Sequence, residues 1–198
     1  VRETEFVSLK GDGSYPFIGG DLVSTDGVRK KEHEYRSMTN EYLVEQSTSK
    51  WSRLSRQSFA VGALARTNNN FATLHPLARE IAASFGLKPM NHNPFMNNIA
   101  QLVECVHVVK DSLALIDELT GSVWQVPRQP VTPKSGVGVG AVEVPRGILY
   151  HAYEFDSDGR ITNCDCVIPT SQNHANIQFD LQALVTQEAT KGNQDRDL

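Results

Sequence analysis

The chain has 198 residues, a formal net charge of −4, and apolar and charged fractions of 39% and 21%. That length suits one domain or one and a half, and the composition is that of a soluble globular protein. The acidic balance gives no electrostatic case for nucleic acid, and no apolar run approaches the roughly 20 residues of a membrane helix.

The first half of the chain predicts a small sheet followed by helices. Short apolar runs within residues 1–30 alternate with glycine and aspartate turn signals, a pattern typical of an antiparallel meander. From residue 33 to about 45 the pattern turns helical, with Tyr35, Met38 and Tyr42 on one side. Residues 31–125 are expected to be mainly helical.

Two further helices have clear boundaries. One starts at His75-Pro76, with proline in the first turn, and ends at Phe85 before Gly86. The other runs from residue 93 to Gly121. Its apolar side chains recur mostly at steps of three and four: Phe95, Ile99, Leu102, Val103, Val106, Val109, Leu113, Ile116 and Leu119. A helix this long needs partners, so the sequence predicts part of a helical bundle.

The last third predicts a β-hairpin and a final helix. After a linker marked by Pro127, Pro130 and Pro133, residues 126–190 hold two extended segments, at 141–155 and 161–168, around an Asp-Ser-Asp-Gly turn. Thr170 or Ser171 can then cap a helix, and residues 191–198 read as a frayed tail. The fold class is therefore α+β.

The open end of this hairpin is the candidate site. The incoming strand begins beside Pro145 and Arg146, and the outgoing strand finishes beside Pro169 and Thr170. Paired strands would bring the two proline-stiffened segments together. A guanidinium and a hydroxyl held there would form a preorganised donor cluster for an anionic ligand.

The hairpin also carries two thiols. A loop at 156–159 would pair His151 with Cys164 and Leu149 with Cys166, all on one face. Such a group could take zinc or copper. A half-buried apolar face that uses cysteine as a small hydrophobe is the simpler interpretation. The glycine run at 136–140 is interpreted as close backbone packing beneath the hairpin.

Three segments resemble one enzyme family. EVPRGILYH at 143–151 and VIPTSQN at 167–173 resemble the penultimate motif of nickel–iron hydrogenase large subunits. SFAVGALARTN at 58–68 is similar to a second signature of that family, and Glu45 and Ser49-Lys50 fit its cytoplasmic, cofactor-coupled branch. The likeness extends over most of residues 1–190.

The resemblance implies a function. The parent protein would oxidise H2 reversibly at a Ni–Fe(CN)2CO centre, in the cytoplasm, with an iron–sulfur small subunit and electron-transfer subunits as partners. Arg146 would point its guanidinium at the open side of that centre. Pro145 and Arg146 would contact one cyanide on iron, and Pro169-Thr170 would lie at the second.

The cysteines depart from the family pattern. The family holds its centre with two Cys-x-x-Cys pairs, whereas this chain has three cysteines, Cys105, Cys164 and Cys166, and no such pair. We therefore expect a central and C-terminal fragment with no metal ligand and no bound cofactor, inactive alone and prone to self-association through surfaces meant to be buried. Two alternatives stay open: a metal-free hydrogenase-like structural subunit of a respiratory-type complex, and a small zinc or copper module that uses Cys164, Cys166 and His151.

Overall fold

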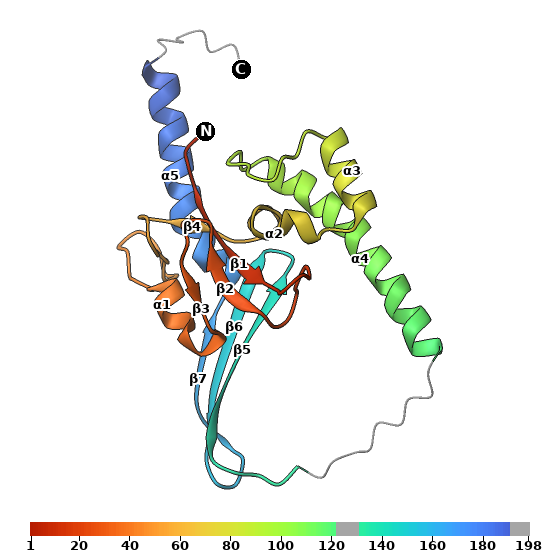
Figure 1. Ribbon diagram of the computed structural model, residues 1–198. Helices are drawn as coiled ribbons and strands as arrows, with labels where there is room; N and C mark the ends of the chain where they lie inside the picture. The colour runs from red at the N-terminus through yellow and green to blue at the C-terminus, as the bar shows by residue number, and fades with distance from the viewer. Residues whose placement is uncertain (122–130, 191–198) are drawn as a thin grey trace.

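The computed structural model describes residues 1–121 and 131–190, and in these residues it has five α-helices and two sheets (Figure 1). The expected α+β class is confirmed. The expected linker prolines Pro127 and Pro130 and the expected tail at 191–198 lie outside the described residues.

The first sheet has the strand order β3-β2-β1-β4. Its strands are β1 (Glu5–Lys10), β2 (Asp21–Ser24), β3 (Arg29–Lys30) and β4 (Phe59–Ala60). β1 pairs with β2 and β2 pairs with β3, both antiparallel, which confirms the predicted meander. β4 pairs with β1 in parallel. The apolar run before residue 19 instead lies against the second sheet: the Phe17 carbonyl accepts the Glu143 N–H at 2.8 Å.

The second sheet has three antiparallel strands, β5 (Gly136–Val144), β6 (Gly147–Phe155) and β7 (Ile161–Val167). The prediction of one extended segment over 141–155 was wrong, because Pro145 and Arg146 turn the chain and separate β5 from β6. Proline has no N–H for a ladder. The glycine run at 136–140 forms the start of β5 and pairs with β6, so it does not form the packing segment expected beneath a two-stranded hairpin.

The register of β6 and β7 also differs from the prediction. His151 pairs with Cys166 and Tyr153 pairs with Cys164, two residues away from the expected pairing. Arg160 belongs to the turn, where its carbonyl accepts the Asp156 N–H at 3.0 Å, and an irregularity at Glu154/Phe155 adds a further offset. Because the offset is an even number of residues, the side chains stay on the expected face.

The long helices confirm the sequence prediction. They are α3 (Pro76–Ser84), α4 (Met96–Thr120) and α5 (Pro169–Thr190). Pro76 opens α3, whose Phe85 cap precedes Gly86 at φ 71°.

The helical segments between residues 32 and 73 differ more from the sequence prediction. After the short 3-10 turn η1 (Glu32–Glu34), α1 (Tyr35–Thr39) ends well before residue 45, because Asn40 adopts a left-handed backbone at φ 35°. Helix α2 (Ala63–Asn70) was not predicted; it is followed by the 3-10 turn η2 (Phe71–Thr73).

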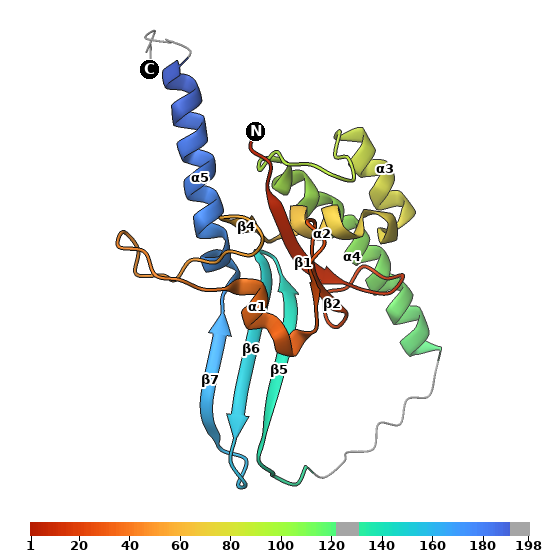
Figure 2. The ribbon, with the colours of Figure 1, turned by 60° about the vertical axis from the view of Figure 1, so that its left-hand side comes forward.

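Strand β1 separates two apolar cores. Phe6 packs with side chains of α2, α3 and α4, whereas Val7 and Leu9 pack with α1, β4 and the second sheet. This follows from the alternation of side chains along a strand. Helix α2 lies between β1 and α4, as Figure 2 shows, so it joins the helical part to the sheets.

Helices α4 and α5 extend away from the sheets (Figures 1 and 2). Along these helices, mostly toward their outer ends, lie large apolar side chains that are more than half exposed: Leu102, Val109, Leu113, Leu115, Ile116, Leu119, Ile177, Leu181, Leu184 and Val185. The described residues therefore contain only part of the expected bundle. None of their helices is long and apolar enough to cross a membrane.

These apolar ends predict that the 198-residue chain self-associates. Replacing Leu113 and Ile116, which are 52% and 53% exposed, by glutamate should reduce this association because charge opposes burial of the helix. Sedimentation velocity over a range of concentrations measures it. The control with the same added charge is Gln101→Glu with Ser112→Glu, on the same helix. A wild-type chain that stays monomeric at all concentrations would contradict the prediction.

Candidate functional site

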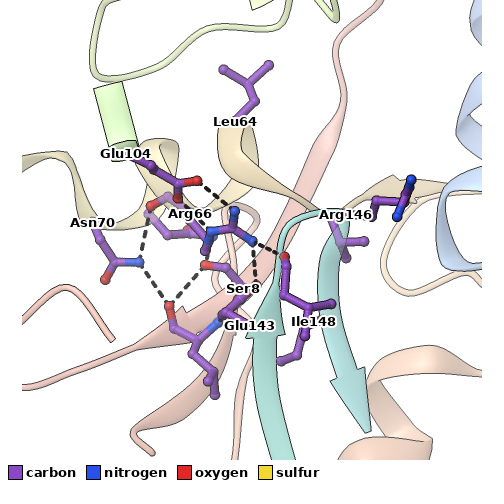
Figure 3. Close-up of polar contacts among 12 residues, drawn as sticks. Ser8, Leu64, Arg66, Asn70, Glu104, Glu143, Arg146 and Ile148 are labelled. Atoms are coloured by element: carbon purple, nitrogen blue, oxygen red, sulfur yellow. Dashed lines mark hydrogen bonds and ion pairs between the residues drawn. The ribbon is translucent and has the colours of Figure 1, made fainter. Parts of the chain in front are cut away.

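Pro145 and Arg146 form the turn between β5 and β6, and both are exposed. Val144 and Gly147 pair across the turn. Figure 3 shows the Arg146 side chain pointing away from the neighbouring cluster of polar side chains. Within the described residues, its guanidinium makes no hydrogen bond or ion pair. The turn therefore presents an unpaired permanent cation.

The turn packs tightly against the loop before α2. Gly147 has φ +133°, and a Cβ at this position would lie 2.3 Å from Val61 Cγ2 and 3.0 Å from the Gly62 nitrogen. Gly62 has φ +122° and lies against the Arg146 carbonyl. Only glycine suits both the backbone angle and the space at residue 147. The segments at 58–68 and 143–151, which carried the family resemblance separately, are thus in direct contact.

The start of α5 contacts the same turn. The Gln172 side chain donates to the Ile148 carbonyl at 2.8 Å, and the Asn173 side chain donates to the Arg146 carbonyl at 3.4 Å. Pro169 is buried and Thr170 is exposed. Among the described contacts, none joins the Thr170 hydroxyl to the Arg146 guanidinium. The two segments come together through Gln172 and Asn173, to which the sequence analysis assigned no role.

Beneath the turn lies a buried ion cluster centred on Arg66 of α2 (Figure 3). Its Nε and Nη2 donate to the two carboxylate oxygens of Glu104 at 2.6 and 2.7 Å. Its Nη1 donates to Glu143 Oε2 at 3.0 Å and to the Val144 carbonyl at 2.9 Å. Arg66 therefore ties α2 to α4, to β5 and to the residue before Pro145.

The cluster extends to the first sheet. Glu143 Oε1 accepts the Leu9 N–H at 2.8 Å, and the Tyr15 hydroxyl donates to Glu104 Oε1 at 2.5 Å. The Asn70 side chain donates to the Leu9 carbonyl at 2.9 Å. Each charged group thus has hydrogen-bonding partners, which a buried charge requires.

Burial sets the protonation of this cluster. It raises the pKa of Glu143 to about 7, against the Arg66 charge and the Leu9 N–H, which both lower it. For Arg66, burial alone would lower the pKa, but the bonds and charges of Glu104 and Glu143 outweigh burial and raise it. The guanidinium stays charged.

The thiols do not form a metal centre in the part of the chain that the structure describes. Cys166 Sγ lies 3.4 Å from His151 Nδ1, which also contacts the Tyr153 hydroxyl at 2.8 Å. No group of three His, Cys, Asp or Glu residues in the described ranges could hold a metal ion. Cys164 and Cys166 are exposed, so their interpretation as small hydrophobes was wrong, whereas His151 and Tyr153 on the same face are half-buried as expected.

The described residues consequently do not fit the ligand set of a Ni–Fe centre, which needs thiolates. They do form a turn that is held on both legs by side chains and that presents a cation. Arg66 could have been singled out from the sequence as an arginine within an apolar segment. Its carboxylate partners, 38 and 77 residues away, could not.

Known proteins are similar to this chain in sequence and in fold. A family model described as "Nickel-dependent hydrogenase" matches residues 22–185. The chain is 34% identical over 173 residues to the sulfhydrogenase 1 subunit alpha of Pyrococcus furiosus, covering 87% of this chain and 40% of that protein. It is 33% identical over 153 residues to the NAD-reducing hydrogenase HoxS subunit beta of Cupriavidus necator, covering 72% and 31%.

Two solved structures share the fold. An NAD+-reducing NiFe hydrogenase in the H2-reduced state aligns with a TM-score of 0.64 at 22% identity, over 87% of this chain and 41% of that one. The Ni-Fe-Se hydrogenase of D. vulgaris Hildenborough aligns with a TM-score of 0.56 at 17% identity, over 85% and 43%. The chain thus spans less than half of each protein named.

Replacing Arg66 by methionine should destabilise the fold strongly. The change leaves Glu104 and Glu143 buried without their cation, and we expect the free energy of unfolding to fall by about 3–5 kcal/mol. Urea denaturation measures it. The control is Arg160→Met, whose ion pair with Asp158 is solvated and 3.9 Å long, and whose loss should change stability little. Equal effects of the two changes would contradict a stabilising role for the cluster.

Glu143 should make stability depend on pH. Because its folded pKa of about 7 lies above the ordinary value of 4.5, its contribution is fully present below about pH 4.5 and is lost as the pH rises through about 7. The stability difference between wild type and Glu143→Gln should therefore shift against wild type by on the order of 1–3 kcal/mol between about pH 5 and about pH 7.5. Urea denaturation of both proteins tests this; a difference that is constant with pH would refute it.

Proposed function

The chain belongs to the nickel-dependent hydrogenase family, and we propose that it is a segment of a hydrogenase large subunit whose parent oxidises H2 reversibly to protons and electrons. One observation carries the proposal. The family-like segment at 58–68 meets the two at 143–151 and 167–173, which the β6–β7 hairpin brings together, at the Arg146 turn through Val61, Gly147 and Asn173. Segments that were alike only by chance would have no reason to meet at one place.

Arg146 is the proposed catalytic residue. Its guanidinium is exposed and has no partner among the described residues, while the backbone that carries it is packed against Gly62. A fixed, always charged donor stabilises anionic ligands and the charge that develops when hydrogen is split heterolytically. We propose that Pro145 and Arg146 contact one cyanide of the parent's centre and that Pro169 and Thr170 lie at the second.

The Ni–Fe(CN)2CO centre itself would be held by the parent. It supplies the hydrogen chemistry when bound, and its thiolate ligands would come from outside this chain, whose cysteines lack the required pairs. The isolated chain is accordingly proposed to be inactive. The chain would contribute the Arg146 turn to the surroundings of that centre.

The proposed partners follow from the same assignment. An iron–sulfur small subunit and electron-transfer subunits would take electrons from the parent, in the cytoplasm. The similarity to an NAD-reducing hydrogenase supports a soluble, cofactor-coupled complex. The exposed apolar ends of α4 and α5 fit a chain that is meant to pack against more polypeptide.

Arg146→Lys in the full-length large subunit tests the function. Lysine keeps the charge but loses the rigid fork, so we expect the rate of H2 oxidation to fall by about 100-fold or more. Nickel and iron content, measured on the same samples, should stay the same because Arg146 is not a ligand. The control is Arg160→Lys in the turn between β6 and β7. Wild-type turnover in Arg146→Lys would refute the assignment.

A further inference from the structure

We propose that Asn173 is a positioning residue for Arg146: one side-chain amide fastens the arginine's backbone to the loop before α2 and so limits the region that the guanidinium can reach. The inference rests on the proposed function only for the role that it gives Arg146. The anchoring contacts stand independently of that role.

A single amide joins three segments. Asn173 Oδ1 accepts the Val61 N–H at 2.8 Å, and Asn173 Nδ2 donates to the Arg146 carbonyl at 3.4 Å. Val61 precedes α2, Arg146 lies between β5 and β6, and Asn173 lies in the second turn of α5. The contacts are 112 and 27 residues apart in sequence, so they hold the tertiary arrangement and not a local turn.

The chemistry of the two partners requires an amide. Val61 offers a donor and Arg146 offers an acceptor, and only a group with one acceptor and one donor side satisfies both. The same partners fix the amide's orientation, because a flipped amide would set donor against donor and acceptor against acceptor. An aspartate could keep the Val61 contact but has no hydrogen to donate to Arg146 when ionised.

The helix that carries Asn173 is itself held on both sides of it. Before it, Gln172 donates to the Ile148 carbonyl at 2.8 Å. After it, the Ser58 hydroxyl donates to Asn176 Oδ1 at 3.2 Å, and Arg2 pairs with Asp180 at 2.9 Å. Asn173 is therefore a fixed point to which the turn can be anchored.

The Arg146 side chain depends on this anchor more than other side chains would. Buried side chains are oriented by their neighbours, but Arg146 is exposed and its guanidinium has no partner in the described ranges. Its backbone fixes where this side chain starts, and therefore which region the guanidinium can reach. On one leg of the turn Arg66 holds the Val144 carbonyl at 2.9 Å, and on the other leg Asn173 holds the Arg146 carbonyl.

Two variants of the 198-residue chain separate the two halves of the contact. Asn173→Asp keeps the acceptor for Val61 and removes the donor to Arg146, whereas Asn173→Ala removes both. The matched control is Asn163→Asp on β7, an exposed position whose side chain makes no described hydrogen bond and which receives the same charge. Amide exchange at Val61 and backbone order parameters at Arg146 and Gly147, both by NMR, are the readouts.

We expect Asn173→Ala to speed exchange at Val61 by about tenfold or more, because a part-buried donor loses its acceptor. Asn173→Asp should leave that exchange within about threefold of wild type. Both variants should lower the order parameters at Arg146 and Gly147. Order parameters in Asn173→Asp that match those of Asn163→Asp would overturn the proposal.

The full-length large subunit supplies the second measurement. There Asn173→Asp should lower kcat for H2 oxidation by about tenfold, with KM for H2 and the nickel and iron content unchanged, which a loss of folding alone would not produce. A mobile Arg146 turn with unchanged kcat would support the anchoring contact but refute the positioning role of Asn173, whereas the catalytic role of Arg146 is tested separately by Arg146→Lys. A rigid turn in Asn173→Asp would refute the anchor whatever the activity.

Discussion

The fold depends on one buried arginine. Arg66 is 2% exposed and stands between Glu104 of α4 and Glu143 of β5, so a helix–helix contact and a helix–sheet contact share the same charge. Burying three charges is costly unless every hydrogen-bonding group is satisfied. The cluster meets that condition through Tyr15 and the Leu9 N–H, and it leaves little freedom in how α2, α4 and the second sheet are arranged.

Two arginines with opposite environments define the candidate site. Arg66 is buried and satisfied, and it holds the Val144 carbonyl on one leg of the β5–β6 turn. Arg146, two residues after Val144, is exposed, and its guanidinium has no partner within the described part of the chain. The first gives rigidity and the second gives an available charge. A turn that combines both is suited to bind an anionic or developing negative charge without reorganising.

The described residues enclose two apolar cores but leave parts of two helices uncovered. β1 has apolar side chains on both faces and separates two cores, and these are complete enough to bury the Arg66 cluster. The outer ends of α4 and α5 have no such cover among the described residues. The chain spans about 40% of the sulfhydrogenase 1 subunit alpha, and the uncovered helix ends agree with a subunit in which more polypeptide packs on them.

Local sequence determined the elements whose signals are local. The steps of three and four along 93–121 predicted one helix, Pro76 marked the first turn of another, and the Asp-Ser-Asp-Gly turn predicted a hairpin. The motifs were enough to indicate the family. Pairing between distant segments was decided only by the tertiary structure. The glycine-rich start of β5 has weak strand propensity, and its pairing with β6 makes it a strand. The β6–β7 register depends on an irregularity that the turn sequence does not predict. The partners of Arg66 and the contacts of Asn173 likewise exist only once helices and strands are packed, because burial creates the need for them.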